Sequence, residues 1–256
     1  MQYITLISDW KLRDPHVAMF KGLLVSAMPT YFILDITHSI EPKNINQTAF
    51  ILKNSYQSFP KGTLHIILTN LQHPSHSLPV LVEWNGHFFI GEDKGVFSLL
   101  VDNKTINKAW QYPQESSKSI LEKILEMAGW HFNGKIEQHC TILNKVVRRL
   151  QPSSYYNPID NILTGQIVYI TSSGNAVTNI PVSQFLEAKE GKSFTTSIES
   201  KKYVTISKFH EHYNEKESET YFLPGLLNHI EITMNSGPIA VLESLYVGDH
   251  VEISFK

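Results

Sequence analysis

Two hydrophobic patterns alternate in the first part of the chain. Short apolar runs rich in β-branched and aromatic residues predict buried strands at 3–7, 31–36 and 63–68. Between them, apolar residues recur three or four positions apart, which predicts helices at 17–27 and 45–56. Strand, helix, strand, helix, strand with short connections predicts a mostly parallel sheet with right-handed crossovers.

The pattern then changes. Residues 79–84 and 87–90 are apolar runs on either side of Asn85-Gly86, which is a strong hairpin signal. A further helix is expected at 119–129, and Tyr155-Tyr156-Asn157-Pro158 is expected to be irregular and to belong to a linker.

After Gly165, short β-rich segments are separated by Gly, Ser, Asn and Pro, which predicts a small all-β domain, either a sandwich or a barrel. The expected strands are 166–171, 177–180, 203–208, 229–234, 239–242 and 250–255. The predicted fold is an α/β N-terminal domain with a mostly parallel central sheet, residues 1–155, and a smaller barrel-like C-terminal domain, residues 164–256.

Asp9 is the first candidate for chemistry, because it falls where the first strand ends. Asp14-Pro15 follows as a helix start, with Asp as the N-cap and Pro at the first helical position. In open α/β sheets, ligands bind outside the carboxyl ends of the strands. Asp9 is therefore a candidate ligand-binding carboxylate, with the alternative that it caps its own turn.

Charge and composition narrow the class of protein. The 22 basic and 24 acidic residues are nearly balanced, so no nucleic-acid or membrane-surface partner is expected. The single cysteine, Cys140, excludes an internal disulfide framework and a multi-cysteine metal site. His210 and His212 flank Glu211 but have no further ligand nearby, so they are interpreted as surface residues and not as zinc ligands. No leader pattern is present, and no apolar run approaches the ~20 residues of a membrane helix, so a cytoplasmic protein is expected.

A series of short motifs runs through nearly the whole chain. In the first part they are Ile4–Trp10, Asp14–Val17, Lys21-Gly22, Pro29, Asp35–Ile40, Ala49–Leu52 and Phe59–Thr63. Further on they are Gly91–Gly95, Gly174–Ile180, Asn235–Gly237 and Gly248–Val251. In this order they resemble the S-adenosyl-L-methionine (SAM) hydroxide adenosyltransferases, relatives of the fluorinase and chlorinase.

The resemblance implies an α/β domain followed by a small β-barrel, in a homotrimer that binds SAM between the N-terminal domain of one subunit and the C-terminal domain of the next. It implies nucleophilic displacement at the ribose C5′, in which a halide or an activated water attacks and methionine leaves. The adenosyl ligand is the substrate, and no metal or redox cofactor is needed.

Carried over residue by residue, the ribose-binding carboxylate of the family falls on Asp9. A second acidic position falls on Asp14, for which the helix-capping role is the favoured alternative. The expected ligand contact of the C-terminal domain is Asn175, although Gly174 beside it argues equally for a plain turn. Ser236 matches a serine near the amino-acid end of the ligand.

Departures from the family fall on its water-activating set. The catalytic Asp position is Asn70, the Arg position is Ser77 and the His position falls near Ser116. An asparagine orients a water but cannot take its proton. His73 and His76 in the same loop are candidate substitutes, because imidazole titrates near neutral pH; the alternative is that both are exposed loop histidines without function.

Other departures fall outside this set. The Asp and the aromatic residue of another family run are Thr171 and Ser173, and the tryptophan of halogenating relatives falls on Lys43.

Two hypotheses follow. The first is cleavage of SAM at C5′, with water as the nucleophile, to give adenosine and L-methionine. The second is a catalytically silent, trimeric protein that binds an adenosyl or nucleoside ligand and has lost the Asp-Arg-His set. Divergence to another adenosyl-type ligand is a third, since fold does not fix chemistry.

Overall fold

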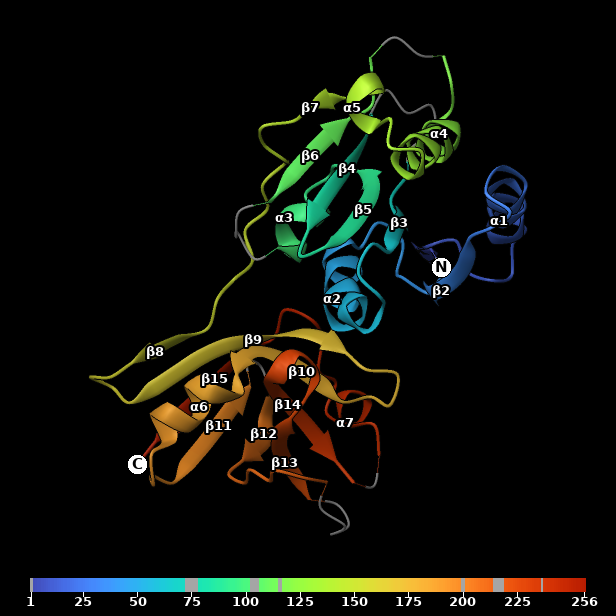
Figure 1. Ribbon diagram of the computed structural model, residues 1–256. Helices are drawn as coiled ribbons and strands as arrows, with labels where there is room; N and C mark the ends of the chain where they lie inside the picture. The colour runs from blue at the N-terminus through green and yellow to red at the C-terminus, as the bar shows by residue number, and fades with distance from the viewer. Residues whose placement is uncertain are drawn as a thin grey trace. The chain divides into compact units, whose positions relative to one another are not determined.

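The chain folds as two units, residues 1–150 and 151–256, each with its own β-sheet (Figure 1). The computed structural model describes residues 2–71, 78–101, 106–114, 117–198, 201–213, 219–235 and 237–256, with the backbone alone for 201–204. The helices in these ranges are all too short or too polar to cross a membrane.

The N-terminal unit is built on a mixed seven-stranded sheet in the order β2-β1-β3-β5-β4-β6-β7. The pairs among the first four strands of this order are parallel, and those of β4, β6 and β7 are antiparallel. The strands are β1 Tyr3–Ser8, β2 Phe32–Thr37, β3 Leu64–Leu68, β4 Pro79–Trp84, β5 His87–Glu92, β6 Lys108–Gln111 and β7 Thr141–Ile142. The helices are α1 His16–Ala27, α2 Ile45–Ser55 with the 3-10 turn η1 Tyr56–Ser58, α3 Val96–Leu100, α4 Ile120–Phe132 and α5 Ile136–His139.

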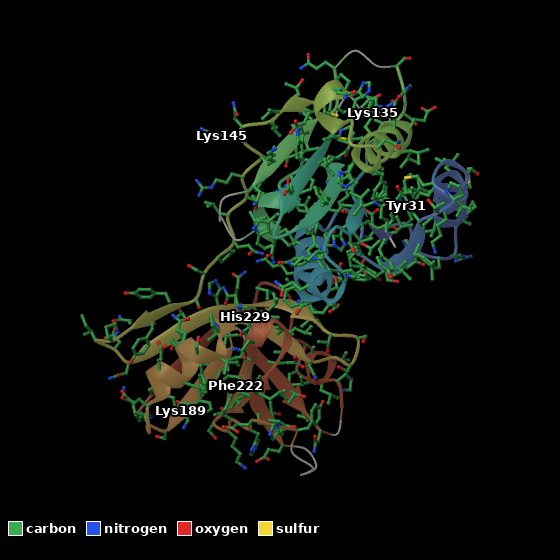
Figure 2. The ribbon with its side chains drawn as sticks, viewed as in Figure 1. Tyr31, Lys135, Lys145, Lys189, Phe222 and His229 are labelled. Atoms are coloured by element: carbon green, nitrogen blue, oxygen red, sulfur yellow. The ribbon has the colours of Figure 1, made fainter. Side chains whose placement is uncertain are left out.

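Helices cover both faces of this sheet. Because successive side chains of a strand point to opposite faces, Leu6 and Ile66 pack with α1 and α4, whereas Ile7 and Ile67 pack with α2 and α3. Tyr31, which is labelled in Figure 2, packs at the first of these faces against Phe132, with 4.2 Å between ring centroids and the rings tilted by 39°. Burial on two faces explains why β1 and β3 are nearly continuous apolar runs.

Local signals place the next elements. The hairpin between β4 and β5 is confirmed: Trp84 pairs with His87, and Asn85 and Gly86 have φ of 50° and 74°, as a type I′ turn requires. Helix α4 begins after Ser119, whose hydroxyl accepts from the N–H of Glu122 in a capping box.

The expected cap of α1 was wrong. Pro15 occupies the N-cap position of α1 and no side chain caps it, while Asp14 is exposed one residue earlier. Its carboxylate accepts no hydrogen bond from any residue in the described ranges.

The C-terminal unit is an antiparallel, barrel-like sheet, which confirms the predicted all-β architecture. The strand order is β12-β11-β15-β9-β10-β14-β13, with β8 paired to β9, and close approach between β12 and β13 nearly closes the barrel. Its interior is apolar, and Phe222 of β13 is fully buried there (Figure 2). The strands are β8 Tyr155–Asn157, β9 Ile162–Ile170, β10 Ala176–Pro181, β11 Phe194–Ile198, β12 Lys201–Ile206, β13 Thr220–Pro224, β14 His229–Met234 and β15 His250–Phe255. Helices α6 Val182–Lys189 and α7 Ile239–Leu242 and the 3-10 turn η2 Leu226–Asn228 complete the unit.

Two expectations here were wrong. The run 239–242, predicted as a strand, is the one-turn helix α7, because four apolar residues are too few to distinguish the two periods. Tyr155–Asn157, predicted as irregular, is strand β8 and pairs with β9. The strands β11 and β13 and the helix α6 were not predicted.

Candidate functional site

Asp9 lies at the carboxyl edge of the parallel part of the N-terminal sheet. Its Oδ2 accepts two backbone hydrogen bonds, from Asn70 N at 3.0 Å and from Lys43 N at 3.1 Å. Asn70 closely follows β3, and Lys43 lies in the segment between β2 and α2, so one carboxylate oxygen joins the end of β1 to the segments that follow the two neighbouring strands. Its Oδ1 accepts no hydrogen bond from any residue described in the structure. Asp9 therefore fixes the segments that follow two other strands through Oδ2, while its Oδ1 has no partner among the described residues.

The two amides that hold Asp9 come from unusual backbone positions. Asn70 has φ of 56° and Lys43 has φ of 64°, both in the left-handed region. Asparagine adopts this conformation more readily than most residues, whereas lysine does so rarely. Asn70 thus has a structural reason for its residue type besides any role in chemistry.

A relay of side chains, buried at Ser8 and His38 and exposed at Asp35, ties β1 to β2 beside Asp9. Ser8 Oγ lies 2.7 Å from His38 Nδ1, and His38 Nε2 lies 3.0 Å from Asp35 Oδ1. Burial acts to raise the pKa of Asp35, but the hydrogen bond from Lys21 and the hydrogen bond and charge of His38 together hold this pKa below its ordinary value. A Ser-His-Asp set is typical of nucleophilic catalysis. Ser8 and His38 are both buried, however, so the relay is interpreted as a brace for the turn that carries Asp9.

The ion pair of Glu92 and Lys94, at the end of β5, also contacts the Asn70 backbone. The Lys94 ammonium donates to the carbonyl oxygen of Asn70 and is ion-paired with Glu92. Only 21% of the Lys94 side chain and 1% of the Glu92 side chain are exposed. The sequence carries a signal here, since the charged residues Glu92, Asp93 and Lys94 come just after a buried apolar run, but the segment Gly91–Gly95 was interpreted only as a family motif.

In the C-terminal unit, Asn175 is buried and its amide is engaged on both sides. Its Nδ2 donates to Glu231 Oε1 at 2.7 Å, and its Oδ1 accepts from Thr233 Oγ1 at 3.0 Å. Gly174 has φ of 83°, and an added Cβ would lie 2.3 Å from Cβ of Pro238. Glycine is thus required at this turn by both conformation and space.

Five of the sequence candidates, His73, His76, Ser77, Ser116 and Ser236, lie outside the described residues.

His210 lies 3.6 Å from a Glu219 carboxylate oxygen. Within the described ranges, no group of three or more His, Cys, Asp and Glu side chains could hold a metal ion.

Comparison with known families gives two matches that together span most of the chain. The family model for the SAM hydroxide adenosyltransferase N-terminal domain matches residues 4–130, and that for the SAM hydroxide adenosyltransferase C-terminal domain matches residues 165–252.

Individual relatives are distant. An (R)-S-adenosyl-L-methionine hydrolase from Methanocaldococcus jannaschii is 20% identical over 91% of this chain and 96% of that protein. A protein of the same name from Thermus thermophilus is 26% identical over 39% of this chain and 38% of its own length. A fluorinase from Nocardia brasiliensis is 33% identical over 26% of this chain and 22% of its own length. Among solved structures, an uncharacterized conserved protein from Thermotoga maritima superposes with a TM-score of 0.84 at 18% identity, covering 98% of this chain and 99% of that one, which shows a shared fold.

Proposed function

Because the chain belongs to the SAM hydroxide adenosyltransferase family, we propose that it cleaves SAM at the ribose C5′ with water, giving adenosine and L-methionine. The observation that carries the proposal is the Asp9 carboxylate at the end of β1, which is anchored through Oδ2 and whose Oδ1 accepts from no residue that the structure describes. A carboxylate oxygen accepts strong hydrogen bonds from ribose hydroxyls.

The mechanism begins with positioning. In it, Asp9 holds the ribose diol, so that C5′ is presented to an attacking water in one orientation. The water oxygen forms a bond to C5′ while the C5′–S bond breaks and its electron pair stays on the sulfur of methionine. One proton of the water must leave, and Asn70 cannot accept it at ordinary pH. We therefore assign the proton acceptor to His73, with Asn70 orienting the water.

A second candidate function is a protein that binds adenosine or a related nucleoside without cleaving SAM. Asn70 favours this alternative, because it replaces the family's acidic residue and occupies a left-handed turn that suits asparagine. In this case Asp9 keeps its role and His73 has none.

The proposal includes a homotrimer in the cytoplasm, with the ligand between subunits, where Asp14, Asn175 and Ser236 also contact it. Support for assembly comes from large apolar side chains that are exposed on α1 and β2, including Leu23 and Phe32. Analytical ultracentrifugation measures the assembly, and a monomeric protein that still turned over SAM would contradict the shared site.

The test is incubation of the purified protein with SAM, with and without chloride, followed by chromatographic quantitation of adenosine, 5′-chloro-5′-deoxyadenosine and methionine. Release of adenosine and methionine in equal amounts, in proportion to the protein, is expected from the wild type and from Glu137→Gln, an exposed control. Asp9→Asn should lose both turnover and adenosine binding, because it keeps the shape but removes the charge. His73→Ala should lose turnover alone.

The other outcomes separate the candidates. Adenosine binding by calorimetry without product, abolished by Asp9→Asn, would establish the binding protein. Chlorinated nucleoside would identify halide as the nucleophile. Turnover that is unchanged in Asp9→Asn would show that the ligand site lies elsewhere.

A further inference from the structure

Glu92 and Lys94 meet the candidate site because of the strand register. Strands β3 and β5 are parallel neighbours, with Ile67 opposite Gly91, so the residues that follow the two strands emerge side by side. The Lys94 ammonium there donates to the Asn70 carbonyl oxygen and pairs with the Glu92 carboxylate. Neither charged residue has a role in the function proposed above.

The Asn70 residue is thus held from both sides. Its N–H donates to Asp9 Oδ2 at 3.0 Å, and its carbonyl oxygen accepts from Lys94. Its φ of 56° is unfavourable for an L-residue, and such a conformation persists only where surrounding contacts fix it. The contact from Lys94 is one of these, and it leads directly to the amide that anchors Asp9.

The ion pair of Lys94 with Glu92 is not explained by a contribution to the stability of the fold. Removing two charges from water costs about as much as their attraction returns, so a buried ion pair is often no more stabilising than apolar residues of similar size. With 1% of its side chain exposed, Glu92 belongs to this class. A gain in the position of a neighbouring group is a stronger reason.

We propose that Lys94, held by Glu92, is a positioning residue for Asp9: by fixing the backbone conformation of Asn70 it sets the carboxylate that binds a ribose diol. The positioning follows from the contacts, whereas the ligand class rests on the function proposed above. Loss of the Lys94 ammonium should therefore weaken binding only for ligands that carry the diol.

The first experiment measures calorimetric affinities for adenosine and for 2′,3′-dideoxyadenosine, which lacks the hydroxyls assigned to Asp9. Lys94→Met is expected to bind adenosine roughly tenfold more weakly and dideoxyadenosine within about twofold of wild type. Lys94→Arg should restore the affinity for adenosine. Lys108→Met is the matched control. Lys108 lies on β6 of the same sheet, and the variant removes an exposed ammonium that is paired with Glu137 of α5. An equal loss for both nucleosides would overturn the inference, since it would indicate a general structural effect.

The second experiment needs no ligand. Hydrogen–deuterium exchange at the Asn70 amide should be faster in Lys94→Met than in wild type or Lys108→Met. Lys94→Met leaves the buried Glu92 carboxylate without the Lys94 ammonium, which could itself disturb the structure. The double variant Glu92→Gln/Lys94→Met removes this charge as well, and it should show the same faster exchange at Asn70. Unchanged exchange at Asn70 in both variants would overturn the positioning role.

The two experiments separate the two proposals. Faster exchange at Asn70 in a protein whose wild type binds neither nucleoside supports the positioning by Lys94 and refutes the proposed ligand. Diol-dependent binding with no effect of Lys94→Met supports the proposed ligand and refutes the positioning.

Discussion

Lowering the pH from 7 to 5 should destabilise the N-terminal unit through two buried histidines. His65 on β3 and His87 at the start of β5 are both fully buried, with His65 Nε2 3.2 Å from His87 Nδ1. The other ring nitrogen of His65 lies 2.7 Å from the Thr5 hydroxyl. His65 stacks on Phe89, with 4.8 Å between ring centroids, and Tyr56 packs edge-on against His87 at 5.1 Å. Such a site has no room to hydrate an imidazolium.

The burial sets the direction of the effect. Burial, with the charge of His87 adding to it, lowers the pKa of His65 to about 3. Burial, with the charge of Lys61 adding to it, lowers the pKa of His87 to about 4. Both values lie below the pKa of about 6.5 in an unfolded chain. The stability from the neutral rings is therefore complete above pH 6.5 and is lost as the pH falls towards 4, because only the unfolded chain takes up protons in this range.

The magnitude follows from the same values. One pKa unit corresponds to about 1.4 kcal/mol, so each histidine should lower the free energy of unfolding by about 2 kcal/mol at pH 5, and the pair by about 4 kcal/mol. This is a large part of the roughly 5–15 kcal/mol by which domains are stable.

Urea unfolding followed by tryptophan fluorescence measures the effect in one unit, because the four tryptophans all belong to the N-terminal unit. They are Trp10, Trp84, Trp110 and Trp130. Between pH 7 and 5, the free energy of unfolding of His87→Phe should fall by about 2 kcal/mol less than that of wild type. The variant lacks one titrating ring and keeps an aromatic ring of similar size in its place. His16→Gln, at an exposed position of α1, should follow wild type. The same loss in His87→Phe as in wild type would refute the assignment of the acid sensitivity to this pair.

Three further predictions concern stability, measured by urea or thermal unfolding. Gly174→Ala should lower the free energy of unfolding by about 1–3 kcal/mol, because φ is 83° and the new Cβ meets Pro238; an unchanged midpoint would contradict the turn geometry. Ser119→Ala should cost about 1 kcal/mol through the lost helix cap, with Ser119→Asp as the variant that restores it. Leu6→Ala should cost about 2–5 kcal/mol, because Leu6 is fully buried, whereas Leu12→Ala at an exposed position should stay within about 0.5 kcal/mol of wild type.

The first strands were predictable because burial on both faces leaves a plain signal in the sequence. Residues 3–7 and 63–68 each contain an apolar run that is too short for a helix and lies between turn residues. The hairpin at Asn85-Gly86 was predictable for a different reason, since few residue pairs accept positive φ at two successive positions. Short elements in the barrel carried neither signal. In β11, two threonines and a serine lie between Phe194 and Ile198. The buried positions of this strand alternate with exposed ones, but the middle buried position is the polar residue Thr196, so the sequence shows no apolar alternation.

For the site, the sequence placed Asp9 correctly at the carboxyl end of a strand, but its contacts could not be predicted. The amides that hold it belong to Lys43 and Asn70, and they meet Asp9 only when three strands and two crossovers have folded. The hydrogen bond from Lys94 to the Asn70 carbonyl oxygen depends in the same way on the register between β3 and β5, which no local pattern encodes.

The anchoring of Asp9 by backbone amides has a consequence for how this chain can diverge. If side chains at positions 43 and 70 donated to Asp9, only residues with a suitable donor could occupy these positions. The donors are backbone N–H groups, so any residue that adopts a left-handed backbone conformation there can hold the carboxylate. Substitutions at Lys43 and Asn70 can therefore accumulate over evolution while the carboxylate keeps its place. The position of the Asp9 carboxylate is in this way independent of the side chains at positions 43 and 70.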